Sequence, residues 1–224
     1  MTNIGCVIPI RGINSGKQRL RKSLPSFKHA QISSLISLIL GRTFNLCSDY
    51  FKPVWIMTKN PTDILNQLQK KPSRVIQDPS EDLNESLSSV AKEMASNTNA
   101  MAVITPDLPL LQSDDIKRLL KYFNGQNCII APSKDVGTSG LIVPLNTVSP
   151  ISDFGFQFGA QSFSKHLQAF STASLTYQVI HSRGFLWDLD NIDDIREIFQ
   201  EQKHLLPESL EKKMLSLISP NSDF

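Results

Sequence analysis

Near its N-terminus the chain carries the apolar run IGCVIPI at residues 4–10, followed directly by the basic run RGINSGK at residues 11–17. The first run is typical of a buried strand, and Pro9 near its end stops the pairing because proline cannot donate to a sheet ladder. Apolar side chains at helical spacing follow over residues 29–47. Between strand and helix, residues 11–26 are predicted to form a basic loop.

The same alternation continues along the chain. Short apolar runs predict further strands at 54–58, 74–77, 101–105, 128–131, 141–144, 175–180 and 185–189. Helices are predicted at 62–70, 83–95, 114–123, 163–170, 192–199 and about 207–218. Strands that alternate with helices favour an α/β fold with a mostly parallel central sheet and helices on both faces. A length of 224 residues suits a single domain over 1–224.

Composition and charge narrow the class of protein. Hydrophobic residues make up 40% of the chain, and the formal net charge is +2. Mixed charges of this kind predict neither a nucleic-acid partner nor a membrane surface. The longest apolar stretch, near residues 32–40, is too short to span a bilayer. Cys6, Cys47 and Cys128 lack metal or redox spacing, and free thiols without a signal peptide predict a cytoplasmic protein.

Ligands in such folds bind beyond the carboxyl ends of the strands. That rule selects the loops at 11–19, 78–86, 106–109 and 133–140. The first of them combines glycines, which let a backbone approach phosphate closely, with Lys17 and Arg19. It is not a Walker P-loop, because Lys17 lacks the following Ser or Thr. Taken alone, a solvated basic loop explains this segment equally well.

Acidic residues form the second half of a candidate site. Asp107 follows the strand predicted at 101–105, although a turn aspartate bonded to its own backbone is the alternative interpretation. Asp188 and Asp190 would project to one face of a strand at 185–189. Two like charges there repel each other unless a cation lies between them. Three carboxylates would suit Mg²⁺, which takes hard oxygen ligands.

Two further segments join glycine to hydroxyl groups, VGTSG at 136–140 and FGAQSFSKH at 158–166. Backbone amides and hydroxyls in such segments bind phosphate or carboxylate oxygens. A turn and a helix cap explain each segment when it is taken alone. His166 by itself favours a structural role over a catalytic one.

Five motifs occur in a fixed order: Lys17-x-Arg19-Leu20, Asp107-Leu-Pro-Leu-Leu111, Gly137-Thr138, Phe158-Gly-x-x-Ser-Phe-x-x-His166 and Asp188-x-Asp190. Together, over residues 4–199, they resemble the 2-phospho-L-lactate guanylyltransferase family of coenzyme F-420 biosynthesis. The resemblance implies a Rossmann-like fold of the nucleotide-diphospho-sugar-transferase type, GTP as donor and Mg²⁺ as cofactor. It also implies transfer of GMP to 2-phospho-L-lactate, phosphoenolpyruvate or 3-phospho-D-glycerate, with release of pyrophosphate. The product would pass to the transferase that uses the deazaflavin Fo.

The resemblance also implies roles for individual residues. The catalytic residues would be Lys17, Asp107, Asp188 and Asp190, with the three aspartates as metal ligands. The acceptor would contact Thr138, Gly159 and Ser162. The nucleotide would contact Arg11, Lys17, Arg19 and Asn84.

Departures from the family pattern keep alternatives open. Val136 and Ser139 stand where many members have Gly and Asn, which leaves the identity of the acceptor undecided. Arg11 stands where Lys is usual, which preserves the charge and changes its geometry. The alternatives are another small-molecule nucleotidyltransferase of this fold, similar to the molybdenum-cofactor guanylyltransferases, and a non-catalytic nucleotide-binding protein. An apolar helix at 210–218 would suit a homodimer.

Overall fold

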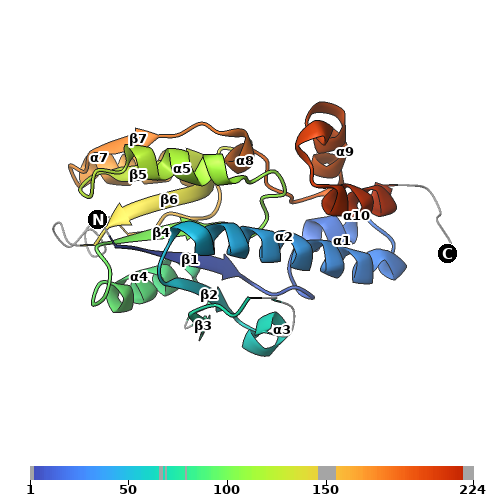
Figure 1. Cartoon of the computed structure of the whole chain (residues 1–224), viewed down its shortest axis with the longest axis horizontal. Coiled ribbons are helices and arrows are strands. Elements are labelled where there is room, and N and C mark those ends of the chain that lie inside the picture. The colour runs from blue at the N-terminus through green and yellow to red at the C-terminus, as the bar shows by residue number, and fades with distance from the viewer. Residues whose placement is uncertain (1–2, 66–67, 69, 79, 146–154, 219–224) are drawn as a thin grey trace.

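A single sheet of seven strands organises the molecule, in the order β3-β2-β1-β4-β6-β5-β7. The computed structural model describes residues 3–65, 68, 70–78, 80–145 and 155–218. The strands are β1 (Ile4–Ile10), β2 (Val54–Thr58), β3 (Arg74–Gln77), β4 (Ala100–Ile104), β5 (Cys128–Pro132), β6 (Thr138–Pro144) and β7 (Tyr177–Val179). Only β6 runs antiparallel to its neighbours among these strands, as its arrow shows (Figure 1). The prediction of a mostly parallel α/β sheet is confirmed.

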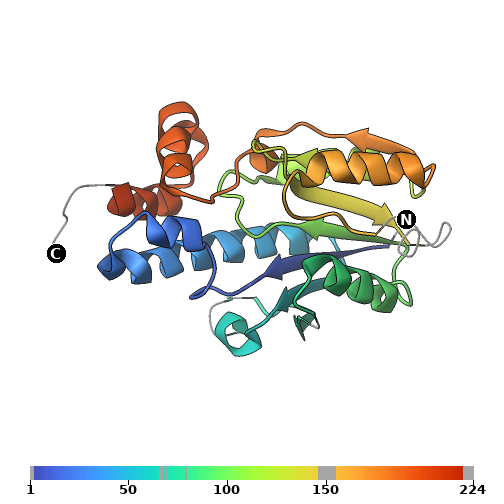
Figure 2. The same cartoon turned by 180° about the vertical axis from the view of Figure 1, so that it is seen from behind.

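Helices cover both faces of the sheet, as predicted. On one face lie α2 (His29–Tyr50) and α5 (Ser113–Tyr122), and on the other lie α4 (Leu83–Met94) and α7 (Ser162–Thr172) (Figures 1 and 2). At the end toward which β1 runs, α1 lies beside α9 and α10 (Figure 1). The remaining elements are α1 (Gln18–Lys22), η1 (Ser26–Lys28), α3 (Pro61–Leu65), α8 (Arg183–Leu186), α9 (Ile192–Glu201), η2 (Lys203–Leu205) and α10 (Glu208–Ile218).

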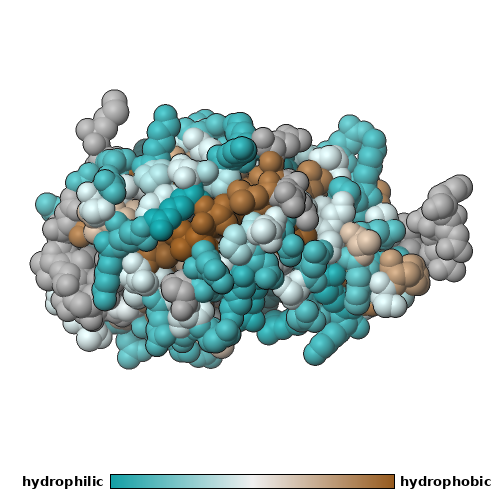
Figure 3. Space-filling model, turned by 90° about the horizontal axis from the view of Figure 1, so that it is seen from below, coloured by the Kyte–Doolittle hydropathy of each residue, from teal (hydrophilic) through white to brown (hydrophobic). Residues whose placement is uncertain are grey.

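The central strands are buried on both faces, which explains their continuous apolar sequence. Every residue of β2, β4, β5 and β6 is buried. The edge strand β3 differs, because Arg74 and Gln77 are exposed and only Val75 and Ile76 are half-buried. Seen from the side of β3, a hydrophobic band crosses an otherwise hydrophilic surface (Figure 3).

Several predicted boundaries are wrong. Residues 185–189 do not form a strand, because Arg183–Leu186 is helix α8 and residues 187–190 are irregular. The segment is apolar because its side chains enter the core and not because it forms a strand. Phe185, for example, is fully buried and packs on Gly140 of β6. The predicted loop at 11–26 contains helix α1. The helix predicted at 62–70 is described only over Pro61–Leu65, and residues 66–67 and 69 lie outside the described residues.

The C-terminal helix packs within its own chain. Leu210, Met214 and Leu217 of α10 are buried, and α10 lies against α2. The apolar face that suggested a homodimer therefore covers this chain's own core. Within the described residues, no helix combines the length and apolar character needed to cross a membrane.

Candidate active site

Lys17 joins the predicted basic loop to two of the predicted acids. It precedes α1 in a left-handed conformation, with φ 53° and ψ 49°. Its Nζ donates to Asp107 Oδ2 and, at 2.6 Å, to Asp190 Oδ1. Arg19 lies farther out, with Nη1 3.7 Å from Asp190 Oδ2. Burial alone would lower the pKa of Lys17, but the charges of Asp107 and Asp190 raise it well above its ordinary value. Lys17 is therefore a protonated, half-buried cation.

Asp188 and Asp190 differ in how their surroundings shift their pKa values. Burial and the charges of Asp107 and Asp190 raise the pKa of Asp188 from 3.8 to about 7. Burial also acts to raise the pKa of Asp190, but Lys17 outweighs it and lowers that pKa. A backbone hydrogen bond of 3.0 Å from Leu189 N to Asp107 O holds the two acidic segments together. The predicted acids thus lie together, presented by a loop and not by a strand, and their catalytic role stays a prediction.

The donor set of this cluster is compatible with a hard divalent cation. Asp107 Oδ1 is buried and has no hydrogen-bond partner among the described residues. Asp188 lies in a negative field that a cation would relieve. No three His, Cys, Asp or Glu side chains in the described part of the chain converge closely enough to hold a metal ion. Lys17 instead takes the place between Asp107 and Asp190, so the Mg²⁺ site stays a prediction.

A cavity of about 460 Å³ opens beside this cluster. Of the predicted residues it is lined by Arg11, Lys17, Arg19, Asp107 and Asp190. A second hollow of about 440 Å³ adjoins it and shares Arg11 and Leu83. The pair forms a groove over the carboxyl ends of β1, β2 and β4, where an α/β sheet binds its ligands.

Thr138 and Ser162 are brought together by a residue that the sequence did not single out for function. Ser162 Oγ donates to Thr138 Oγ1 at 3.2 Å, and Thr138 Oγ1 lies 3.1 Å from His166 Nδ1. His166 Nε2 accepts from Gln157 N at 3.1 Å, so the proton is on Nδ1, which donates to Ser162 O at 2.8 Å. Burial lowers the pKa of His166 to about 4. A neutral histidine therefore fixes these hydroxyls in place.

Asn84 lies at the other side of the same segment. Its Nδ2 donates to Phe158 O at 3.1 Å, and its Oδ1 accepts from Phe158 N at 2.7 Å. Both ends of the carboxamide are thus hydrogen-bonded to the segment that leads to Gly159, and the contact of Asn84 with the nucleotide stays a prediction. Gly159 has a φ of +122°, a conformation that favours glycine.

A family model described as "Guanylyl transferase CofC like" matches residues 4–217. The chain belongs to this family. It is therefore a nucleotidyltransferase, as the order of its motifs predicted.

Named relatives agree with this assignment. The chain is 26% identical over 223 residues to a phosphoenolpyruvate guanylyltransferase of Thermobaculum terrenum, covering 97% of this chain and 93% of the relative. It is 28% identical over 199 residues to a 2-phospho-L-lactate guanylyltransferase of Methanocaldococcus infernus, covering 86% and 83%. A Desulfovibrio desulfuricans protein described as a nucleotide-diphospho-sugar transferase superposes with a TM-score of 0.78 at 11% identity, covering 96% and 95%. That structural similarity confirms the predicted fold type.

The sequence did not predict a role in this guanylyl transferase site for several residues that the structure places in or next to it. Leu83 and Phe158 line the groove. His166 orders the hydroxyl pair, and Arg21 supports the loop before Lys17. Phe158 and His166 belong to the motif at 158–166, so their position in it was the available signal. Nothing in the sequence around Arg21 distinguishes it from the other basic residues of that loop.

Proposed function

We propose that this guanylyl transferase moves GMP from GTP to a three-carbon phosphorylated acid, such as phosphoenolpyruvate or 2-phospho-L-lactate. The observation that carries the proposal is the groove in which Lys17 meets Asp107 and Asp190. The names of the relatives support both candidate acids. A phosphorylated acid brings a phosphate and a carboxylate, which suits the hydroxyls of Thr138 and Ser162.

The reaction needs positioning more than proton transfer. A phosphate oxygen of the acceptor attacks the α-phosphorus of GTP, forms a new P–O bond, and displaces pyrophosphate. The attacking oxygen is already anionic, so no general base is required. Lys17 is fully protonated and supplies positive charge to the triphosphate. Arg11 and Arg19 lie on the wall of the groove and add to this charge.

The cofactor that we propose for the acidic cluster is Mg²⁺. Asp107, Asp188 and Asp190 would hold it, since Asp107 Oδ1 lacks a hydrogen-bond partner in the described residues and Asp188 is crowded by like charge. When bound, the ion neutralises phosphate charge and orients the reacting oxygens.

The setting of the reaction follows from the proposed product. A guanylylated three-carbon acid carries an activated phosphate. An enzyme that transfers the phosphorylated acid to a hydroxyl of Fo would consume this product.

The three cysteines are free and buried, which supports the proposal of a cytoplasmic, reducing environment. A homodimer would need a surface other than the buried face of α10, and light scattering of the purified protein measures the oligomeric state.

The test is a panel of nucleotides and acids. Purified protein with Mg²⁺ is given GTP and each acid in turn (phosphoenolpyruvate, 2-phospho-L-lactate and 3-phospho-D-glycerate), while pyrophosphate release is followed continuously. Products are identified by mass spectrometry, and ATP, CTP and UTP replace GTP to test base preference. We expect pyrophosphate release with GTP and at least one acid, and a product mass equal to acid plus GMP.

The same panel decides between the alternatives. GTP binding in a calorimeter without pyrophosphate release on any acid would contradict the proposal and indicate a non-catalytic nucleotide-binding protein. Turnover with a sugar phosphate or a molybdenum-cofactor precursor, and with none of the acids, would indicate another nucleotidyltransferase of this fold.

A further inference from the structure

Arg21 is a charged residue in an unusual place. Only 7% of its surface is exposed, yet it forms no ion pair with a carboxylate among the described residues. Burial of a guanidinium without an acidic partner is costly, and it persists only where neutral acceptors satisfy its N–H groups.

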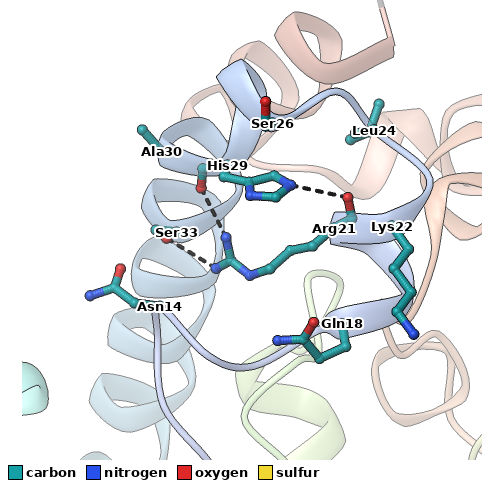
Figure 4. Close-up of a pocket in the computed structure, with 9 residues that line it drawn as sticks. All are labelled: Asn14, Gln18, Arg21, Lys22, Leu24, Ser26, His29, Ala30 and Ser33. Atoms are coloured by element: carbon teal, nitrogen blue, oxygen red, sulfur yellow. Dashed lines mark hydrogen bonds between the residues drawn. The ribbon is translucent and has the colours of Figure 1, made fainter.

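Four hydrogen bonds from the Arg21 side chain join the loop before Lys17 to the first turns of α2. On the loop, Nε donates to Gly16 O at 2.9 Å and Nη2 to Ile13 O at 2.7 Å. On the helix, Nη1 donates to His29 O at 3.1 Å and Nη2 to Ser33 Oγ at 3.0 Å (Figure 4). Four of the five guanidinium N–H groups are thus used.

His29 of α2 also binds the backbone of Arg21. Its Nε2 donates to the carbonyl oxygen of Arg21 at 3.1 Å (Figure 4). The backbone of α1 and the side chain of Arg21 are therefore both fixed to α2. Since α2 packs into the core through side chains such as Ile32 and Leu35, the loop is held against a rigid element.

The hydrogen bonds from Arg21 hold the loop directly before a residue with a strained backbone conformation. Lys17 follows Gly16 directly and has a left-handed conformation, which costs a non-glycine residue on the order of 1 kcal/mol. The strained conformation aims Nζ at Asp107 and Asp190. Released from Arg21, the loop would relax and Nζ would lose this aim.

We propose that Arg21 is a positioning residue, whose guanidinium fixes the carbonyls of Ile13 and Gly16 against α2 and so holds Lys17 between the two carboxylates. The inference rests on the proposed role of Lys17 only where it concerns catalysis. Lysine cannot replace Arg21, because one ammonium cannot reach acceptors on both sides.

The first test measures Lys17 directly, without substrate or metal. Wild type, Arg21→Gln and Arg21→Lys are treated with a limiting amount of acetic anhydride, and acetylation is quantified by peptide mass spectrometry. The exposed Lys165 is the internal reference. Lys22→Gln is the matched control, because Lys22 is the exposed basic neighbour on the same helix. Circular dichroism confirms that each variant is folded.

We expect Lys17 to react about tenfold faster, relative to Lys165, in both Arg21 variants, as suits the loss of one hydrogen bond to a charged group. The Lys22→Gln protein should match wild type. Unchanged Lys17 reactivity in a folded Arg21 variant would overturn the inference, and so would an equal rise at all lysines. If Arg21→Gln fails to fold, Arg21→Lys, which keeps the charge, provides the decision.

The second test uses turnover. Both Arg21 variants should lower kcat and raise the KM for GTP, while the KM for the acid stays near the wild-type value. Equal loss of all parameters in proportion to the unfolded fraction would indicate a purely structural role. Because labelling needs no turnover, an inactive wild type would refute the proposed function without touching the inference about Arg21.

Discussion

Asp188 should make the metal-free protein less stable at neutral pH, and its removal should make it more stable. Its pKa rises from 3.8 to about 7 in the folded chain, through burial and the charges of Asp107 and Asp190. The folded state therefore binds this proton more tightly than the unfolded state does. The stability that this group contributes is fully present below about pH 4 and is lost as the pH rises through about 7.

The size of the effect follows from the two pKa values. A change from 3.8 to about 7 corresponds to ~4 kcal/mol of folding free energy between acid and mildly alkaline pH. Asp188→Asn replaces the carboxyl by a neutral group of the same shape. The variant should match wild type near pH 4 and exceed it by up to ~4 kcal/mol at pH 8, although it should have no turnover.

Urea denaturation in EDTA, followed by tryptophan fluorescence at pH 4.5, 6 and 8, measures this difference. Asp193→Asn is the control, since Asp193 is exposed and pairs with Arg196 at the surface; its effect on stability should be small. An Asp188→Asn protein that is no more stable than wild type at pH 8 would refute the reasoning. Added Mg²⁺ should stabilise wild type and reduce the advantage of the variant, because a ligand that binds only the folded state adds to its stability.

Three further predictions concern other parts of the site. Lys17→Met should lower kcat about 10²- to 10³-fold in steady-state assays with GTP, because a buried positive charge at the phosphates is lost; a wild-type kcat would contradict this. Asn84→Ala should raise the KM for the acid about tenfold and leave the KM for GTP unchanged, because the segment at Phe158 loses two hydrogen bonds. Ser88→Ala, which removes a bond within the same helix, is its control, and an equal KM in both proteins would count against the assignment. His166 should remain a neutral Nδ1–H tautomer at pH 7 and titrate near pH 4 in nitrogen-detected NMR, since burial lowers its pKa; a midpoint near 6.5 would show that the ring is hydrated.

Much of the fold was predictable from the sequence, because the central strands are buried on both faces and their sequence shows it. The strand predicted at 54–58 has the observed bounds of β2, and that at 74–77 those of β3. The direction of β6 was not predictable in this way. In a sheet that is covered on both faces, a parallel and an antiparallel strand have the same apolar sequence. Here β6 runs antiparallel to β5, and the turn at 133–137 connects the two strands.

Only part of the candidate site could likewise be predicted from the sequence. Lys17 and Asp107 follow strands that the sequence defines, so the topology brings them to one edge, whereas Asp190 reaches them through an irregular segment that is bonded to Asp107. A short motif predicts that Asn84 contacts the nucleotide, which stays a prediction, and in the structure its side chain is hydrogen-bonded to the backbone of Phe158. A carboxamide has donor and acceptor groups that suit a base and a backbone equally, so residue type could not separate the two roles.

The segment Asp188-Leu189-Asp190 shows how two acids can lie near Asp107, as predicted, although the predicted local structure is wrong. An acid, an apolar residue and an acid look like strand alternation, and the alternation of burial is real, since Leu189 is 1% exposed. The alternation of burial comes from a tertiary contact and not from a strand. Leu189 is inserted into the core and its N–H donates to Asp107 O, a residue 82 positions earlier in the chain. The two flanking acids are thereby held near Asp107, whatever the backbone conformation. Local periodicity predicts which side chains share a side, but only the contact with the turn at 106–109 determines that this side faces Lys17.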